Sequence, residues 1–575
     1  MNRQYTRLLA LAIFGSGLAP VVTYAASLYK EHPKAVLGWR VFVPLTLVCA
    51  VSAVVWRLLR RWEPGLDANA RRQYEFLAEL PTRYLNLAIF GSAALSLLME
   101  LAIIRWQSTV FEFFAFYKNF SLLACFAGLG LGYAHAGRKQ VPLLFTIPLL
   151  CWEFLLMLSM RYGMGERYRS LTVMPFPEQL NMGISTAHRW YQGTQTFFVL
   201  AVIFLITALL FIPVGQLCGV LMERREKLRA YGLNLLGSLA GVLLIFVLSA
   251  FWTPPLLWFL PIFVGLLLFS VRKTSVLLFG LASATLALSA LAWPVNPLWP
   301  RIYSPYQMLE LGQTDAGLTI IRAAGHYYQR VHNLSSDNRN VDASPQLTAY
   351  RNYYELPYRA FGHPRDVAIV GAGTGNDVAA ALRSGVARVD AIEIDPVIQA
   401  VGANVHPEHP YSDPRVHAII NDARSFLRNT DRNYDIVVYG LLDSHTLLSH
   451  ASSVRLDSFV YTVEGLREAR SRLRPQGMIS LSFSILRPEL GHKIYLMLKE
   501  AFDGRPPICI SSSYDDGVIF IASNDRSFGM PQSLLRPTGL TEATETYADP
   551  RLRADVSTDD WPFFYMPRRV YPVLT

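Results

Sequence analysis

Long apolar runs dominate the chain as far as Trp293, and beyond Pro294 the pattern becomes that of an ordinary globular sequence. A helix needs about twenty apolar residues to cross a bilayer. Nine runs approach this length, and they are Leu8–Leu28, Val36–Leu59, Tyr84–Ile104, Phe113–Ala134, Val141–Met160, Phe197–Leu221, Leu233–Ala250, Leu256–Val271 and Ser275–Trp293. We therefore expect a polytopic α-helical membrane domain of about nine spans over residues 1–295.

Composition supports this division of the chain. Only 17% of the residues are charged and the mean hydropathy is +0.26, which is too apolar for an ordinary soluble protein of 575 residues. The net charge of +10 could suggest nucleic acid, but much of the basic excess lies in short loops between apolar runs, such as 57–61 and 224–229. Basic loops of this kind mark the cytoplasmic side of a membrane protein. We expect a lipid bilayer and no nucleic acid as partner, and the five scattered cysteines indicate neither disulfides nor a metal site.

The loop charges also carry information on orientation. With the N-terminus inside, the loops on that side hold roughly twice as many Lys and Arg residues as the others. Nine spans would then place the second half of the chain outside, whereas the ligand argued below is made in the cytoplasm. This conflict stays open at the level of sequence.

A second, polar half begins after the last apolar run. Two segments, Tyr306–Leu311 and Leu318–Ile321, read as strands, and turn-prone residues separate them at Asp315–Gly317. We expect a small β-hairpin domain over residues 300–345 and an α/β domain over residues 346–575.

The α/β domain opens with a glycine-rich turn. A short buried strand, Asp366–Val370, runs into Gly371, Gly373 and Gly375 and then into a helical stretch. Such glycines let backbone N–H groups approach a ligand at a helix N-terminus. A second strand ends at Glu393, about twenty residues after the first glycine, where an acid can accept both ribose hydroxyls.

Three further strands separate the possible ligands of this turn. The strand before Asn421-Asp422-Ala423, the strand Tyr434–Tyr439 and the strand after Leu473–Gly477 follow in the order of S-adenosylmethionine-dependent methyltransferases. In this arrangement Asp422 would lie near an adenine. The fold class expected is a polytopic helical membrane domain followed by a Rossmann-like α/β domain of that type, with the small β domain at its start.

Several phrases of this half are similar to one family. The stretch from about Ser304 to Asp525 resembles the spermidine synthases (polyamine aminopropyltransferases), of the bacterial group with an N-terminal multi-span membrane domain. The resemblance rests on Ser304-Pro-Tyr-Gln307, Tyr353-Tyr-Glu355, Glu393-Ile-Asp-Pro396, Asp413-Pro-Arg-Val416, Asn421-Asp422-Ala423 and Leu473-Arg-Pro-Gln-Gly477. It implies decarboxylated S-adenosylmethionine or S-adenosylmethionine as co-substrate and no metal. The residues that it places around this ligand are Gln307, Gly371, Gly373, Gly375, Glu393, Asp422 and Ala423.

The sequence departs from the family where the amine should bind. The family carries an acid in the glycine loop, where this chain has Thr374, and another five residues after Asp435, where it has Gly440. An amine must lose a proton before it can attack, and a nearby carboxylate accepts that proton. By the resemblance, Asp443 in the loop after the fourth strand falls where the family has its second, diamine-binding carboxylate. A short shift of this loop would make it the base, and Asp443 is the catalytic base that we predict.

Three functions remain open on these residues. The first is a membrane-bound aminopropyltransferase-like enzyme of polyamine biosynthesis, acting on a small amine. The second is a methyltransferase with a membrane-associated acceptor, which the apolar loop around Asp443 would suit. The third is a non-catalytic transporter or sensor that binds a nucleoside or polyamine. The expected location is the bacterial inner (plasma) membrane with a cytoplasmic soluble domain, and a homodimer is a further hypothesis.

Overall fold

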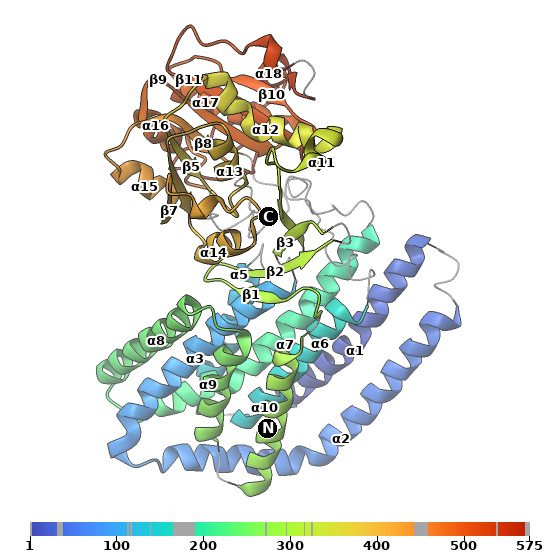
Figure 1. Ribbon diagram of the computed structural model, residues 1–575. Coiled ribbons are helices and arrows are strands. Elements are labelled where there is room, and N and C mark those ends of the chain that lie inside the picture. Colours follow the sequence, from blue (N-terminus) through green and yellow to red (C-terminus); the bar gives the residue numbers. More distant parts are fainter. Residues whose placement is uncertain are drawn as a thin grey trace. The chain divides into compact units, whose positions relative to one another are not determined.

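The computed structural model describes residues 3–31, 38–111, 114, 118–137, 140–164, 190–270, 273–294, 296–314, 317–323, 326–441, 458–535 and 539–569. Two compact units divide the chain: residues 1–177 with 185–297, and residues 178–184 with 298–575. We call them the helical unit and the α/β unit, and each is described by itself (Figure 1).

Each of the nine apolar runs coincides with a helix of the helical unit. These helices are α1 (Arg3–Glu31), α2 (Trp39–Ala78), α3 (Thr82–Val110), α5 (Lys118–Ala134), α6 (Thr146–Tyr162), α7 (Trp190–Glu223), α8 (Lys227–Ala250), α9 (Pro255–Leu268) and α10 (Thr274–Ala292). Among the described residues, seven helices are long and apolar enough to cross a membrane when α6 is taken together with the 3-10 turn that precedes it (Leu143–Tyr162), whereas α5 and α9 are shorter. Helix α2 continues well beyond the end of its apolar run at Leu59, and it contains Pro64, a residue that bends helices.

Glycines allow two pairs of these helices to pack closely. A Cβ atom at Gly128 of α5 would overlap with the backbone oxygen of Ala208 in α7. In the same way, a Cβ atom at Gly237 of α8 would overlap with the backbone oxygen of Phe90 in α3. Small residues at such contacts let helix backbones approach each other, as is common in membrane bundles.

A polar cluster lies within this apolar unit. Glu153 of α6 is fully buried, and its Oε1 accepts hydrogen bonds from Gln107 Nε2 and, at 3.0 Å, from Thr207 Oγ1. The other carboxylate oxygen has no hydrogen-bond partner among the described residues. A carboxylate in such surroundings is costly, so it usually has a function when the helices span a membrane.

The α/β unit begins with a four-stranded antiparallel sheet. Its strands pair in chain order as β1 (Arg301–Tyr303), β2 (Met308–Gln313), β3 (Thr319–Ala323) and β4 (His326–Val331). The predicted hairpin corresponds to β2 and β3, and the structure adds one strand on either side. Residues 304–307 form a turn before β2, so the strand begins two residues later than the alternation suggested.

An eight-stranded sheet forms the centre of this unit. The strand order is β12-β10-β11-β9-β8-β5-β6-β7, in which β5 to β9 are parallel and the remaining pairs are antiparallel. The strands are β5 (Asp366–Val370), β6 (Arg388–Glu393), β7 (Val416–Ile420), β8 (Tyr434–Tyr439), β9 (Leu473–Ser484), β10 (Ile508–Ser511), β11 (Gly517–Ser523) and β12 (Thr541–Glu542). Strands β5 and β8 are buried along almost their whole length, as parallel strands covered on both faces are.

Helices pack around this sheet (Figure 1). They are α11 (Arg339–Ala343), α12 (Pro345–Phe361), α13 (Asn376–Arg383), α14 (Pro396–Val405), α15 (Ala423–Asn429), α16 (Val463–Ser471), α17 (Pro488–Ala501) and α18 (Thr544–Ala548). The strand predicted after Gly477 begins earlier, because residues 473–477 are already part of β9. There the pairing with β8 shifts register, because Tyr434 pairs with Leu473 and Ile436 with Met478. The proline and glycine of this segment thus lie at an irregularity within a strand.

Candidate functional site

The order of the parallel strands identifies where a ligand would bind. Strand β5 has β6 on one side and β8 on the other, so the chain progresses in opposite directions from β5. In open α/β sheets, ligands bind at such a switch point, outside the carboxyl ends of the strands. The glycine loop follows the carboxyl end of β5, Glu393 is the last residue of β6, and Asp422 lies two residues after β7.

The glycine loop adopts a backbone that other residues reach only with strain. The φ angles are +70° at Gly371, +56° at Gly373 and +105° at Gly375, all in the left-handed region. The loop also lies close to neighbouring side chains, because a Cβ atom at Gly373 would stand 3.1 Å from the amide group of Gln329. These glycines are therefore required by the local backbone, whatever ligand the loop binds.

Glu393 connects the glycine loop with the end of β6. Its Oε2 accepts the N–H of Gly373 and its Oε1 accepts the N–H of Asp395, both at 2.9 Å. The side chain is only 6% exposed, and burial raises the pKa of its carboxyl group to about 7, although the two backbone N–H groups oppose this shift. Each carboxylate oxygen can accept more than one hydrogen bond, so these contacts leave room for ligand hydroxyls.

The turn between β1 and β2 contributes a second wall. Ser304 Oγ accepts the backbone N–H groups of Tyr306 and Gln307 at 3.0 and 2.9 Å, which holds this turn. Gln307 Nε2 lies 3.5 Å from Asp395 Oδ2. Gln307 Oε1 is buried and has no hydrogen-bond partner within the described part of the chain. A buried acceptor of this kind is available to a donor group of a ligand.

Tyr306 shows that several carboxylates converge here. Its pKa is raised by burial, and further by the negative charges of Asp395, Asp422 and Glu393. Asp422 caps helix α15 by accepting the N–H of Ser425 at 2.7 Å, and its side chain remains partly exposed. The structure thus brings the predicted Gln307, Glu393 and Asp422 into one acidic region.

Three further positions that the sequence singled out are Ala423, Asp443 and Thr374. Ala423 is partly exposed next to Asp422, at the start of α15. Asp443, the predicted base, lies outside the described residues. Thr374 is fully buried and lies against Gly402 of α14, where a Cβ atom would overlap with the Thr374 backbone. Its hydroxyl therefore does not replace the acid that the resemblance leads one to expect in the loop.

Two contacts of the glycine loop were not predicted from the sequence. Tyr411 donates its hydroxyl hydrogen bond to the Gly373 oxygen at 2.7 Å, and Thr374 donates its N–H to Gln329 Oε1 at 3.3 Å. Gln329 belongs to β4, a strand that was not predicted. Tyr411 lies just before the Asp413-Pro-Arg phrase, which is the only signal that could have suggested it.

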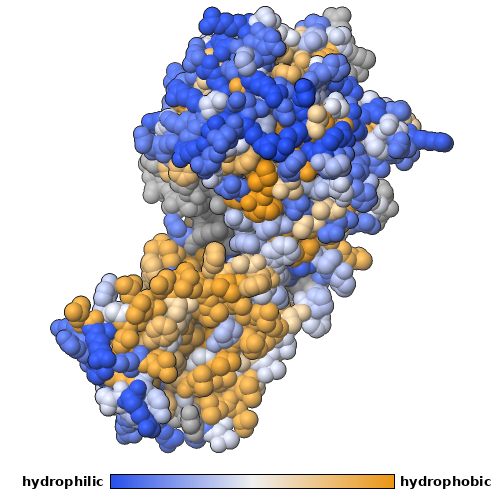
Figure 2. Space-filling model, turned by 60° about the vertical axis from the view of Figure 1, so that its left-hand side comes forward, coloured by the Kyte–Doolittle hydropathy of each residue, from blue (hydrophilic) through white to orange (hydrophobic). Residues whose placement is uncertain are grey.

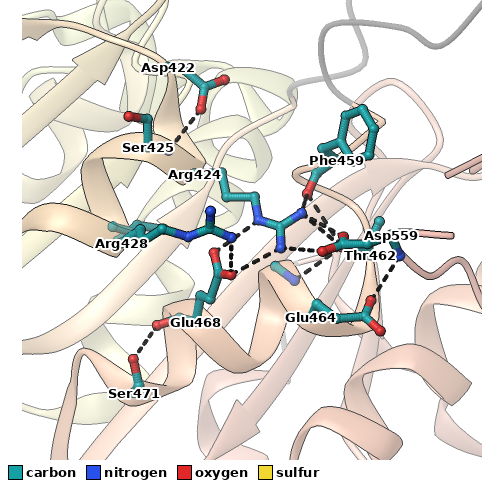
Figure 3. A network of polar contacts seen from close by, with 12 residues as sticks. Asp422, Arg424, Ser425, Arg428, Phe459, Thr462, Glu464, Glu468, Ser471 and Asp559 are labelled. Carbon is teal, nitrogen blue, oxygen red and sulfur yellow. Dashed lines mark hydrogen bonds and ion pairs between the residues drawn. The ribbon is translucent and has the colours of Figure 1, made fainter.

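Arg424 anchors the segment that returns to the sheet after residue 457 (Figure 3). Its guanidinium donates to Glu468 Oε2 at 2.9 Å, to Asp559 Oδ2 at 2.7 Å and to the Phe459 backbone oxygen at 3.0 Å. Asp559 also accepts the Thr462 hydroxyl at 2.9 Å. Because Arg424 lies two residues after Asp422, this network joins the start of α15 to the segment that follows the loop with the predicted base.

We predict that Asp559→Asn lowers the free energy of unfolding of the α/β unit by about 1–2 kcal/mol, since it removes a charged partner from a buried guanidinium. The figure is discounted because the Asp559 side chain is 39% exposed. Arg424 holds the pKa of Asp559 below its usual value, so this stabilisation is present at neutral pH and is lost as the pH falls through that lowered value.

Chemical denaturation of the full chain in detergent measures the effect. The control is Asp549→Asn, in the same C-terminal segment, because Asp549 forms its ion pair with the exposed Arg551. We expect little change for the control, and equal effects of both variants would contradict the anchoring role of Asp559.

Comparisons with known proteins agree with the class of protein that this fold and site define, a Rossmann-like α/β domain of the methyltransferase type. Residues 351–495 match the family model of the spermine/spermidine synthase domain. The C-terminal part of the chain therefore carries a domain of the spermine/spermidine synthase family. This range contains the glycine loop, Glu393 and Asp422, whereas Gln307 lies before it.

The curated relatives are aminopropyltransferases, which are transferases. Polyamine aminopropyltransferase 2 of Hyperthermus butylicus is 26% identical over 171 residues, 28% of this chain and 53% of the relative. Spermidine synthase 2 of Arabidopsis thaliana is 30% identical over 198 residues, 32% of this chain and 53% of the relative. The chain thus spans about half the length of these relatives. A solved structure, a probable spermidine synthase from Corynebacterium glutamicum, aligns with a TM-score of 0.34 at 15% identity and covers 46% of this chain and 97% of that one.

Proposed function

We propose that the protein is a membrane-bound, aminopropyltransferase-like enzyme that transfers an aminopropyl group from decarboxylated S-adenosylmethionine to a small amine. The observation that carries this proposal is the convergence of Gln307, Glu393 and Asp422 beside a glycine loop, in a unit with a spermine/spermidine synthase domain. Carboxylates and a free amide oxygen suit the hydroxyl and amino groups of a nucleoside.

The proposed reaction is a displacement at carbon. The lone pair of the amine nitrogen attacks the aminopropyl carbon that is bonded to the sulfonium sulfur. The carbon–sulfur bond breaks, its electron pair neutralises the sulfonium, and methylthioadenosine leaves. Before the attack, a carboxylate takes one proton from the ammonium form of the amine and so frees the lone pair, and we propose Asp443 for this role because it follows β8 in the sequence. The product of the displacement is then a secondary ammonium ion.

Product analysis tests the proposal directly. The purified full-length protein is incubated with decarboxylated S-adenosylmethionine and common aliphatic amines, and in parallel with S-adenosylmethionine. We expect methylthioadenosine in the first reaction and no S-adenosylhomocysteine in the second. The reverse result would establish the methyltransferase alternative, which Thr374 in place of an acid and the apolar sequence around Asp443 favour.

We propose that the helical unit lies in the bacterial plasma membrane. Hydrophobic residues cover the face of this unit seen in Figure 2, while the α/β unit presents mainly hydrophilic residues there. Large exposed apolar side chains on α8 and α10, such as Phe246 at 69% and Leu278 at 60%, would otherwise contact water. We place the α/β unit in the cytoplasm, where its nucleoside substrate is made, and a C-terminal reporter active only outside that membrane would overturn this placement.

A transporter or sensor is the second candidate, favoured by the buried Glu153 cluster, because a simple anchor does not require an intramembrane carboxylate. The variant Glu153→Gln tests whether the helical unit transports an amine in addition to any enzymatic activity of the α/β unit. Unchanged methylthioadenosine release with altered amine uptake into vesicles would assign transport to the helical unit.

A further inference from the structure

Gly440 follows the carboxyl end of β8 and has no side chain. It lies at the switch point, where the end of β8 adjoins the end of β5. The N–H of Gly440 donates to the Val370 oxygen at 3.3 Å, so the ends of the two strands adjoin. Gly440 does not have a positive φ, unlike the three glycines of the loop, so its backbone does not require glycine. The absence of a side chain therefore has a different physical reason.

A carboxylate from another element fills this space. Asp377 lies in the first turn of α13, and its Oδ2 is 3.0 Å from the point where a Cβ atom of residue 440 would stand. The backbone oxygen of Gly371 lies 3.4 Å from the same point. Two oxygen acceptors thus converge on one position at the strand ends, next to the glycine loop.

The surroundings of Asp377 are aromatic. Tyr354, Tyr358 and Tyr411 are all close enough for its negative charge to raise their pKa values. No Lys, Arg or His among the described residues forms an ion pair with Asp377, and its side chain remains partly exposed. Burial raises the pKa of its carboxyl group to about 7. A charged carboxylate in such surroundings is unfavourable until a cation reaches it.

We propose that Asp377 binds the cationic nitrogen of an aliphatic amine and, with the Gly371 oxygen, holds this nitrogen at the ends of β5 and β8. An ammonium group has three N–H donors and no acceptor, which suits a carboxylate and a backbone oxygen that converge on one point. A metal ion fits less well, because no group of three His, Cys, Asp or Glu side chains converges among the described residues.

This inference rests on the proposed function and extends it to the selection of the amine. Asp377 comes from the helix after the glycine loop, so it supplies the charge at the strand end that neither Gly440 nor the buried Thr374 can supply. Asp443 keeps the proposed role of proton acceptor. The two acids should then affect different kinetic constants.

The first test is Asp377→Asn, which keeps size and removes the charge. We expect the KM for the amine to rise roughly 10–100-fold, as for the loss of one charge-assisted hydrogen bond. The affinity for decarboxylated S-adenosylmethionine should stay within about twofold, because other residues bind the nucleoside. The control is Asp366→Asn, the same change at the opposite end of β5.

A second variant separates a binding role from a structural one. The double variant Asp377→Ala/Gly440→Asp supplies a carboxylate from the end of β8, at nearly the same point. Alanine at position 377 removes the Oδ2 atom that would lie 3.0 Å from the new Cβ atom of residue 440. We expect this double variant to recover most of the lost amine affinity, whereas Asp377→Ala alone does not. A role in folding alone would not produce such rescue.

A direct measurement of amine binding tests this inference independently of the proposed reaction. Calorimetry with methylthioadenosine present measures amine binding without turnover. The inference is supported if an amine binds Asp377→Asn at least tenfold more weakly than it binds the wild type. This holds even if no methylthioadenosine is ever released, because the absence of release would overturn only the proposed reaction. Equal amine affinity of the two proteins, or no amine binding to the wild type, would overturn the inference.

Discussion

Replacement of Asp443 by asparagine should lower the rate of methylthioadenosine release by about 10²–10⁴-fold, the usual effect of losing a general base. Asparagine keeps the size and hydrogen-bonding capacity of the side chain but cannot accept the proton of the attacking amine. Nucleoside binding should persist, because Glu393 and Asp422 lie on other strands. Single-turnover kinetics with saturating amine measure the chemical step without the contribution of amine binding.

The matched control for this variant is Asp431→Asn, an exposed acid just before β8. We expect its rate to equal that of the wild type. Full release of methylthioadenosine by Asp443→Asn would exclude Asp443 as the base. A change of KM alone in Asp443→Asn would instead show that Asp443 binds the amine and does not accept its proton.

The sequence predicts the glycine loop and the order of the parallel strands well, because their signals are local. Gly371, Gly373 and Gly375 need positive φ angles, and the short buried strands of this half read as continuous apolar runs. The acid at position 393 follows from its spacing within one βαβ unit. For the helical unit, the nine apolar runs likewise predict the positions of the helices.

Features that depend on contacts between distant segments were not predictable in this way. Strand β1 has three residues and β4 is largely polar, so neither shows a strand pattern, and both depend on pairing with β2 and β3. The approach of Asp377 to Gly440 is equally invisible, because the sequence places one in a helix and the other after β8. Only the fold brings them to the same point.

The acid at Glu393 does not by itself identify the ligand, and it is the order of the later strands that favours an S-adenosyl compound at the level of sequence. A carboxylate at this position suits NAD and S-adenosyl compounds equally, since both present ribose hydroxyls. The turn at 304–307 adds Gln307, which lies 3.5 Å from Asp395, and Tyr306, whose pKa is raised by burial and by nearby carboxylates that include Glu393. The small β sheet thus adds residues to the acidic region around Glu393 that the Rossmann-like domain does not supply.

Glu393→Ala should weaken binding of decarboxylated S-adenosylmethionine by about 1.5–3 kcal/mol, the contribution of hydrogen bonds to a charged acceptor. The loss includes an indirect part, because the Gly373 N–H loses its partner at 2.9 Å and the loop becomes less ordered. Glu393→Gln keeps one acceptor oxygen and should lose less. Asp413→Asn, an acid paired with Arg415 near the start of β7, is a control for which we expect unchanged affinity.

The wild type should also show a pH dependence that Glu393→Gln lacks. Burial raises the pKa of Glu393 to about 7, so the folded apoprotein begins to take up a proton near neutral pH. A protonated carboxyl accepts ribose hydroxyls poorly, and affinity should therefore fall by up to tenfold per unit as the pH drops below about 7. Asp377 titrates in the same range, so Asp377→Asn must retain the dependence if it arises from Glu393. Calorimetry between pH 6 and 8 decides, and a slope that survives in Glu393→Gln would exclude Glu393 as the ribose-binding acid.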